Sequence, residues 1–441
     1  MFLRFRDERT PFSLLRHMIS SMSGSRCDMV LADVTLPDGR VADLSIRDGL
    51  VCHTGAPLPA EQIISCRGMT VLPGAIDMHV HLRGGIQREK EDWESGSMSA
   101  IAGGVTVVID QPNTIPPLTT PEAFRSRVAE AGRNSRCGFA INAGVTSGTD
   151  LSALWREGAM AFGEIFAAPS SYGEGLSPED LSAALSRIGR LGGLATIHAE
   201  EAGTAVPGTL ADHNRNRPPR GETKTVRAIV QSHGKSARLH FCHLSVASSV
   251  AAAGTASVEV TPHHLFLSIE QSIGSDTLRK VNPPIRSERE REQLVQMWDR
   301  IDVIASDHAP HTLREKDVFF GDAPSGIPGV ETMLPLLVAW MKEGRISRAS
   351  LMEKTSWRPA DILGIPRAGF LPGERADFAL YGDEIAEISV DDLHSRAGWT
   401  PYEGFPAVFP EQVILGGAPA YQDGEFHETA PLWFPGRGYY P

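Results

Sequence analysis

The sequence lacks three features, and each absence excludes a class of protein. Its 441 residues contain no apolar run close to the ~20 residues that a membrane-spanning helix needs. Its five cysteines are widely spaced and form no Cys-x-x-Cys pair, which is typical of reduced thiols rather than of a disulfide framework. The 42 basic residues are outnumbered by 54 acidic ones, so no basic stripe is available to neutralise nucleic-acid phosphates. We therefore expect a cytoplasmic protein that binds neither membranes nor nucleic acids.

The N-terminus does not match a secretory signal. Five arginines occur among the first 26 residues, but Asp7 and Glu8 interrupt them and no hydrophobic region follows. A transit peptide is the alternative. We expect residues 1–27 to be an N-terminal extension ahead of the fold.

Two β-rich segments lie at opposite ends of the chain. Residues 28–72 contain short alternating stretches around the turn signals Pro37-Asp38-Gly39 and Asp48-Gly49. A similar pattern returns in residues 368–441, with a turn at Gln422-Asp423-Gly424. We therefore predict one small β-sandwich domain formed from both chain ends, followed by a C-terminal tail.

Strand-like and helix-like stretches alternate between these segments. Helical candidates such as Pro121–Gly132 and Pro178–Leu191 begin with proline after a Thr or Ser cap. Such alternation is typical of a parallel sheet, and eight units over residues 73–367 fit a closed (β/α)8 TIM-like barrel. An open doubly wound sheet is the alternative. The strand candidates are Gly74–Leu82, Val105–Asp110, Gly138–Val145, Ala159–Ala167, Leu194–Ala199, Arg238–Leu244, Ser257–His263 and Asp302–Asp307.

Polar residues end several of these runs, at the edge where a barrel presents its catalytic groups. His79 and His81 are two positions apart on the first strand, so both imidazoles point to the same side. His198 and His243 end later runs, and Asp307 ends the eighth. Any one of them could be a satisfied core or surface group. Together they would face one mouth, which favours a shared site.

Four imidazoles and one carboxylate suit divalent metal ions. We expect two zinc ions, because nitrogen and oxygen donors dominate, with manganese or cobalt as possible substitutes. Two ions ~3.5–4 Å apart would bind a bridging hydroxide and polarise a carbonyl. Asp307 would be both metal ligand and catalytic residue, taking the proton of that hydroxide and returning it to the leaving nitrogen. The predicted reaction is hydrolysis or formation of an amide bond.

These residues also carry a resemblance to a known family. The segment Val71–Arg83 and the run Ser306–His311 resemble the cyclic amidohydrolases, which include dihydroorotases, hydantoinases and allantoinases. The resemblance covers Asp28 to about Phe426 and implies a distorted TIM barrel beside a β-sandwich. It also implies which histidines hold which metal. The more buried ion would be held by His79 and His81, and the other by His198 and His243.

Further motifs resemble those of dihydroorotases in particular. They are Arg83 after His-x-His-Leu, Gln111-Pro-Asn113-Thr, Val281-Asn282-Pro-Pro-Ile-Arg286 and Gly326–Glu331. By this resemblance, Arg83, Asn113 and His311 hold the substrate carboxylate, which a guanidinium fork matches, and Asn282 binds the pyrimidine ring edge. Arg83 as a surface ion-pair partner, and Asn113 and Asn282 as turn residues, are the alternatives.

Three histidines near these motifs are kept out of the predicted site. The pair His263-His264 follows the seventh strand, and in this family such a pair is usually structural. His308 and His311 cannot both be assumed functional, and only His311 is carried over from the family.

The chain departs from the dihydroorotase pattern at two places. Residues Gly84-Gly85-Ile86-Gln87-Arg88 replace the usual Asp-Pro-Gly, so we expect the loop beside the substrate to have a different shape. The fourth strand, where many relatives carry a carboxylated lysine that bridges the metals, has Glu164 and no lysine. We expect Glu164 to supply the bridging carboxylate. The alternatives are a polar role elsewhere on the mouth and a single-metal site.

The resemblance implies reversible cyclisation of N-carbamoyl-L-aspartate to dihydroorotate in pyrimidine biosynthesis. A hydantoinase or allantoinase is the enzymatic alternative, although an apolar pocket would suit a hydantoinase better than the carboxylate clamp of Arg83 and Asn113. A non-catalytic scaffold for aspartate transcarbamoylase is the other alternative, but such chains lose metal ligands. A homodimer and a partnership with aspartate transcarbamoylase are family expectations.

Overall fold

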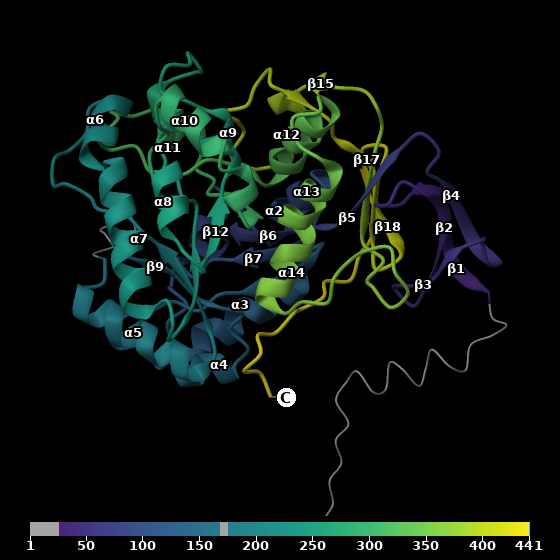
Figure 1. The fold of residues 1–441 in the computed structure, drawn as a ribbon, viewed down its shortest axis with the longest axis horizontal. Coiled ribbons are helices and arrows are strands. Elements are labelled where there is room, and N and C mark those ends of the chain that lie inside the picture. The colour runs from purple at the N-terminus through teal and green to yellow at the C-terminus, as the bar shows by residue number, and fades with distance from the viewer. Residues whose placement is uncertain (1–25, 168–174, 441) are drawn as a thin grey trace, which may run out of the picture.

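The structure is a computed structural model that describes residues 26–167 and 175–440. The predicted N-terminal extension lies outside the described residues except for Arg26 and Cys27, and Cys27 already begins the first strand. Within the described ranges, no helix is both long and apolar enough to cross a membrane. Figure 1 shows a large unit of helices and strands with a smaller β-rich unit at one side.

The smaller unit contains two sheets. The first has the strand order β3-β2-β1-β4. The second has the order β19-β18-β17-β14-β5, and Val71 of β5 pairs antiparallel with Leu380 of β14. Both ends of the chain thus contribute to one sheet, as the alternating patterns predict. The bounds are β1 (Cys27–Thr35), β2 (Val41–Arg47), β3 (Leu50–Gly55), β4 (Ala60–Ser65), β5 (Thr70–Pro73), β14 (Phe378–Tyr381), β17 (Pro410–Leu415), β18 (Ala418–Gln422) and β19 (Glu425–Phe426).

Within the described ranges, the larger unit contains eight parallel strands. They form a three-stranded sheet, β6-β7-β8, and a five-stranded sheet, β13-β12-β11-β10-β9. Single parallel bridges, Ala143 to Phe162 and Val80 to His308, connect the two sheets on both sides. Each strand lies within or overlaps a run predicted from the sequence: β6 (Ala75–Val80), β7 (Val105–Asp110), β8 (Gly138–Ile141), β9 (Phe162–Phe166), β10 (Leu194–His198), β11 (Arg238–Phe241), β12 (Ser257–Val260) and β13 (Val303–Ile304).

Helices follow most of these strands and cover the sheets. The side chains of the two predicted caps accept backbone hydrogen bonds, Thr120 from Ala123 and Ser177 from Asp180. The helices are α2 (Trp93–Ala102), α3 (Pro121–Asn134), α4 (Leu151–Arg156), α5 (Pro178–Leu191), α6 (Leu210–Asn216), α7 (Pro219–His233), α8 (Ala247–Ala252), α9 (Pro262–Phe266), α10 (Glu288–Val295), α11 (Leu313–Lys316), α12 (Val330–Lys342), α13 (Arg348–Met352) and α14 (Arg358–Leu363). A short antiparallel pair joins β15 (Ala386–Glu387) to β16 (Pro406–Ala407).

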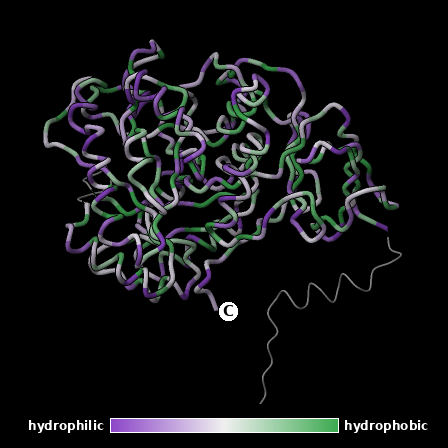
Figure 2. Tube along the Cα trace, in the orientation of Figure 1, coloured by the Kyte–Doolittle hydropathy of each residue, from purple (hydrophilic) through white to green (hydrophobic). Residues whose placement is uncertain are grey.

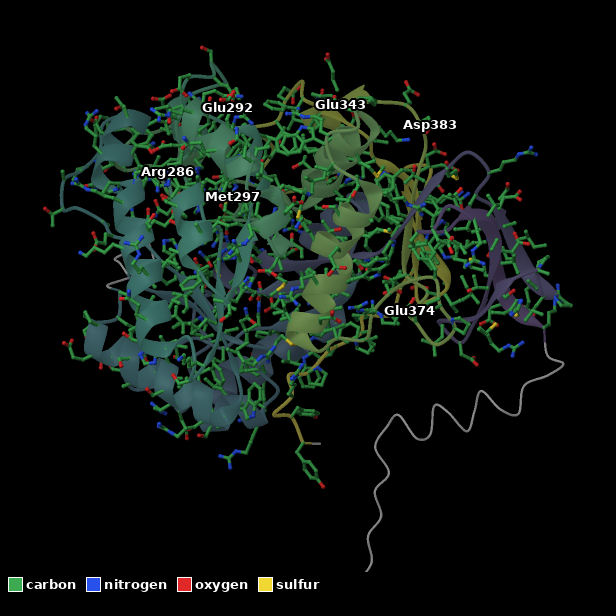
Figure 3. All side chains as sticks on the ribbon, viewed as in Figure 1. Arg286, Glu292, Met297, Glu343, Glu374 and Asp383 are labelled. Atoms are coloured by element: carbon green, nitrogen blue, oxygen red, sulfur yellow. The ribbon has the colours of Figure 1, made fainter. Side chains whose placement is uncertain are left out.

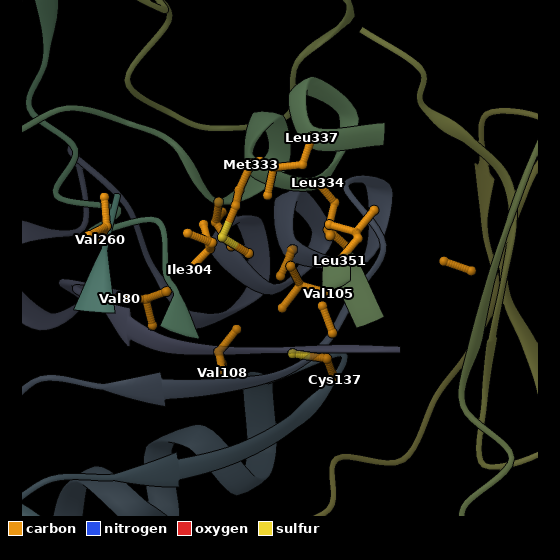
Figure 4. Close-up of a cluster of buried hydrophobic side chains, with 14 of the residues drawn as sticks. Val80, Val105, Val108, Cys137, Val260, Ile304, Met333, Leu334, Leu337 and Leu351 are labelled. Carbon is orange, nitrogen blue, oxygen red and sulfur yellow. The ribbon is translucent and has the colours of Figure 1, made fainter. Parts of the chain in front are cut away.

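Apolar side chains fill the space between strands and helices. Hydrophobic segments run through the interior of the tube in Figure 2, while hydrophilic segments gather on its outside. In the core close-up of Figure 4, Met333 and Leu334 of α12 lie beside Val80, Val105 and Ile304 of the strands. This packing fixes the strand ends from which the polar side chains project.

The C-terminal tail returns to the large unit, an arrangement that the sequence patterns did not predict. The Phe139 amide donates to the Leu432 carbonyl at 2.9 Å, and the Phe434 amide donates to the Phe139 carbonyl at 2.8 Å. The tail therefore extends the edge of β8, parallel to it. The Phe434 side chain is 8% exposed and belongs to the buried cluster that includes Val107 and Ile362.

This packing predicts the effect of shortening Phe434. Phe434→Ala should lower the free energy of unfolding by about 3 kcal/mol, because a buried phenyl ring leaves a cavity. Denaturant unfolding measures the change. Leu432→Ala is the matched control: its side chain is 54% exposed, so the change should stay within about 0.5 kcal/mol. Equal effects of the two substitutions would contradict a role for the Phe434 side chain.

Candidate metal centre

The Glu164 carboxylate lies at the centre of the predicted histidine cluster. Its Oε1 is 2.7 Å from His198 Nδ1 and 2.7 Å from His243 Nε2. Its Oε2 is 3.6 Å from His79 Nε2. All four side chains are buried. One carboxylate on β9 therefore joins histidines from β6, from the end of β10 and from the turn after β11.

Asp307 closes the other side of the cluster. Its Oδ1 lies 3.2 Å from His81 Nε2 and 3.5 Å from His79 Nε2. Among the described residues, possible ligand atoms form three groups of three, each within 4.8 Å. Two of the groups share Glu164: one adds His79 and His81, the other His198 and His243. The third joins His79 to Cys242 and Glu259. The structure thus brings all six predicted metal ligands together. A shared carboxylate between two groups is the arrangement that a bridged pair of ions requires.

The backbone is strained where the chain turns into this cluster. Three non-glycine residues of the predicted site have positive φ: Arg83 at 40°, His243 at 34° and Asp307 at 47°. Such conformations are uncommon for residues with a Cβ and persist only where the surrounding structure enforces them. Here they aim the side chains of strand ends toward one another.

The electrostatics of the cluster favour bound positive charge. Burial would raise the pKa of the Glu164 carboxyl, but hydrogen bonds with His198, His243 and His79 hold that pKa well below its ordinary value. Burial would lower the pKa of His198, but the carboxylates of Glu164 and Glu200 raise it to about 9. The same carboxylates would attract a divalent cation, which competes with protons for imidazole nitrogens.

The donor atoms fit a divalent metal ion. His79 Nε2 is buried and lies 3.5 and 3.6 Å from the nearest carboxylate oxygens of Asp307 and Glu164, too far for a good hydrogen bond. His243 Nδ1 is buried without a hydrogen-bond partner. Buried polar atoms are normally satisfied. Imidazole nitrogens and carboxylate oxygens are the donors that zinc accepts.

Glu259 of β12 supports the cluster and is not among the residues predicted from the sequence. Its Oε1 lies 3.0 Å from His79 Nδ1 and accepts a hydrogen bond from the His243 amide at 3.1 Å. Its Oε2 lies 3.1 Å from His240 Nε2. One carboxylate therefore orients the His79 ring and the backbone of His243, which belong to different ligand groups. A carboxylate within the otherwise apolar end of β12 was the signal that could have revealed it.

Glu200 is a second supporting carboxylate that was missed. It lies 3.0 Å from His198 Nε2 and also contacts the Arg217 guanidinium. Burial would raise the pKa of its carboxyl, but Arg217 and His198 lower it to about 2. The backbone carbonyl of Arg217 in turn accepts a hydrogen bond from the guanidinium of Arg286, a buried residue labelled in Figure 3. His198 is therefore held between two carboxylates.

The predicted substrate residues lie around this cluster. Asn282 lines a cavity together with His81, Glu164, His198 and Asp307. Arg83, Asn113 and His311 are not among the residues that line it.

These three are nonetheless buried. The Arg83 guanidinium lies 3.4 Å from His311 Nε2, and its Nε donates to the Pro310 carbonyl at 3.3 Å. Both amide atoms of Asn113 are buried without partners. Gly326 connects His311 to the cavity, since a Cβ there would come within 3.0 Å of the His311 ring.

The remaining histidines have structural surroundings. His308 Nδ1 accepts the Gly329 amide at 3.1 Å, at the start of α12, and its Nε2 lies 3.4 Å from Glu91. His264 lies between the Thr261 hydroxyl and the Pro283 carbonyl. Burial lowers the pKa of His263 to about 4. None of the three belongs to a group of possible metal ligands among the described residues.

The position of Glu164 predicts metal loss when it is removed. Glu164→Ala should lower the content of bound divalent metal, because the remaining histidines then lack their shared carboxylate. Elemental analysis of dialysed protein measures the content. Glu201→Ala, at a more exposed glutamate that pairs with Lys224, should keep the full content. An unchanged metal content in Glu164→Ala would remove Glu164 from the site.

The contacts of Glu259 predict weaker metal binding when its charge is removed. Glu259→Gln keeps the shape but replaces one acceptor oxygen with a donor, so His79, His240 and the His243 amide cannot all be satisfied. Metal affinity should fall about 10–100-fold in a competition assay with a chelator. Glu292→Gln, on the exposed face of α10, is the control (Figure 3). Equal affinities for the two variants would show that Glu259 does not orient the ligands.

The chain is similar in sequence to proteins of known function. A model of the amidohydrolase family matches residues 70–397. The dihydroorotase of Halobacterium salinarum is 40% identical over 409 residues, which cover 90% of this chain and 97% of that protein. The dihydroorotase of Methanosarcina acetivorans is 37% identical over 431 residues, which cover 90% of this chain and 91% of that protein.

Solved structures show the same fold at lower sequence identity. The L-hydantoinase of Arthrobacter aurescens has a TM-score of 0.86 at 24% identity, covering 93% of this chain and 100% of that one. The dihydropyrimidinase of Brevibacillus agri has a TM-score of 0.83 at 22% identity, covering 94% of this chain and 99% of that one.

Proposed function

Because the chain belongs to the amidohydrolase family, we propose that it catalyses the dihydroorotase reaction. The reaction is the reversible cyclisation of N-carbamoyl-L-aspartate to (S)-dihydroorotate and water, a step of pyrimidine (UMP) biosynthesis. One observation carries the proposal: the buried guanidinium of Arg83 lies beside His311, next to a histidine cluster centred on one carboxylate. The architecture that we infer is a (β/α)8 barrel with a β-sandwich beside it.

We propose that the cluster holds two divalent ions, zinc in the first place, with manganese or cobalt as substitutes. His79, His81, Glu164 and Asp307 would hold one ion, and Glu164, His198 and His243 the other. Such ions, when bound, activate water and polarise the amide carbonyl. Glu164 takes the place of the carboxylated lysine that many relatives have.

Asp307 is the group that moves the proton. Burial would raise the pKa of its carboxyl, but His79, His81 and His243 lower it, so the group is an ionised base at neutral pH. In hydrolysis, its carboxylate accepts the proton of the attacking water and returns it to the ring nitrogen that leaves. In ring closure, the same carboxylate takes the proton of the carbamoyl amine and delivers it to an oxygen of the substrate carboxylate under attack. That oxygen leaves as hydroxide, which takes up one further proton from solvent to become water.

The substrate is held by its α-carboxylate and by its ring edge. Arg83, His311 and Asn113 would bind the carboxylate, because a guanidinium and an unpartnered amide offer donors at buried positions. Asn282 lines the same cavity as Asp307 and would bind the ring edge. These contacts would place the amide carbonyl at the cluster, within reach of Asp307.

The alternative functions have less support. A hydantoinase would favour an apolar pocket, whereas Arg83 is a buried charged residue two positions after the predicted ligand His81. A non-catalytic scaffold would lack metal ligands, whereas this chain has all six predicted ligand side chains in one buried cluster. A homodimer, a partnership with aspartate transcarbamoylase and a cytoplasmic location remain predictions.

The proposed reaction predicts a definite dependence on pH. Ring closure consumes one proton, so the equilibrium ratio of dihydroorotate to N-carbamoyl-L-aspartate should rise about tenfold for each unit by which pH falls in the neutral range. Metal-replete protein should therefore close the ring at mildly acidic pH and open it at alkaline pH. Absorbance of dihydroorotate measures both directions, and hydantoin and allantoin are the comparison substrates. Turnover of hydantoin without either dihydroorotase direction would overturn the proposal.

A further inference from the structure

Two buried lysines hold the backbone of one loop beside the cavity. Lys280 follows the 3-10 helix Asp276–Arg279, and Lys316 ends α11. Their side chains are buried, with exposed fractions of 7% and 0% for the residues. Among the described residues, neither ammonium group lies within 4 Å of a carboxylate oxygen. The proposed reaction uses neither of them.

The two ammonium groups donate hydrogen bonds to backbone carbonyls instead. Lys280 Nζ donates to the carbonyls of Phe320 at 2.8 Å, Gly321 at 3.0 Å and Ala323 at 2.6 Å. All three of its donors are used. Lys316 Nζ donates to the Pro324 carbonyl at 2.9 Å and to the Lys280 carbonyl at 3.2 Å. The four loop carbonyls span residues 320–324, which we call the lysine-bound loop.

The residues that follow this loop form a wall of the catalytic cavity. Ser325 and Gly326 both line it. The Gly326 amide donates to the Lys280 carbonyl at 3.0 Å, so Lys280 holds this stretch through its backbone as well. The Ser325 hydroxyl donates to Asn282 Oδ1 at 3.3 Å. The lysine-bound loop therefore determines where the Asn282 amide is held.

The same loop separates two cavities. An outer cavity is lined by Lys280, by Arg217 and by residues 321–325. Asn282 and Ser325 line both the outer cavity and the catalytic one. If the lysine-bound loop moved away, the catalytic cavity would open toward the outer one. Asn282 would then lose its hydrogen bond from the Ser325 hydroxyl.

A buried ammonium without a carboxylate partner is costly, because it loses hydration. Burial, together with the charge of Arg217, lowers the pKa of Lys280 to about 8. Methionine has a similar length and would fill the same space without that cost. The lysine is therefore better explained by its hydrogen bonds to the loop than by packing alone.

We propose that Lys280 is a positioning residue for substrate binding. Its ammonium fixes the lysine-bound loop, the loop fixes Ser325, and Ser325 with the backbone fixes Asn282 against the ring edge of the substrate. The inference rests on the proposed function, because the role of Asn282 does. Lys280 contacts none of the predicted metal ligands among the residues described, so its loss should weaken substrate binding and leave the chemical step intact.

The test is the kinetics of Lys280→Met with dihydroorotate. KM should rise about tenfold while kcat stays within about threefold. The reason is that a contact which stabilises the bound substrate and the transition state equally affects KM alone when it is weakened. Metal content should equal that of the unsubstituted protein. Lys224→Met is the matched control, because that side chain is 75% exposed and pairs with Glu201, and its KM should not change. Lys280→Arg, which retains donors for the loop carbonyls, should give an intermediate KM.

Two further measurements keep the inference open to refutation if Lys280→Met folds poorly. Ser325→Ala leaves the buried ammonium in place and should also raise KM without lowering kcat. Hydrogen exchange of the amides of residues 319–326 should be faster in Lys280→Arg than in the unsubstituted protein. A normal KM in Ser325→Ala, or a fall in kcat at constant KM in Lys280→Met, would overturn the inference. Absence of activity in the unsubstituted protein would instead overturn the proposed function.

Discussion

The Glu164 carboxylate, buried among three histidines, is the interaction on which the rest of the site depends. An ionised carboxylate away from water requires positive charge or hydrogen-bond donors within contact distance. Glu164 obtains them from His79 on β6, His198 at the end of β10 and His243 in the turn after β11. No local segment of chain could bring these groups together. The parallel arrangement of strands is therefore what makes the cluster possible.

The buried charged groups around the cluster need partners of their own. The structure provides them as chains of side-chain contacts that lead away from the metal ligands. His79 contacts Glu259, and Glu259 contacts His240. His198 contacts Glu200, which contacts Arg217. On the other side of the cavity, Lys280 and Lys316 bind backbone carbonyls. A buried polar network of this kind restricts its members to one geometry, because a partly satisfied network would be unstable.

Much of the architecture followed from the sequence. The apolar runs correctly predicted the eight parallel strands of the described residues, and the caps at Thr120 and Ser177 correctly predicted the starts of two helices. Both signals depend only on residues close to one another in the sequence. The strand-end positions of the histidines also predicted their convergence. Glu164 was identified only because a family resemblance marked its position.

Other features could not be predicted, because they depend on contacts between distant segments. Glu259 and Lys280 acquire their roles from residues elsewhere in the chain. The return of the tail to β8 depends on an edge that no local pattern reveals. Trp399, from the segment assigned to the sandwich, donates to the His311 carbonyl at 2.7 Å beside the site. Periodicity records burial, but it does not identify the partner against which a residue is buried.

The central claim is that Glu164 joins two metal ions. Anomalous diffraction from crystals of the zinc-loaded protein tests it most directly. The account predicts two zinc peaks about 3.5–4 Å apart, with the Glu164 carboxylate in contact with both. A single zinc peak, or two peaks bridged by another group with Glu164 outside both coordination shells, would contradict it.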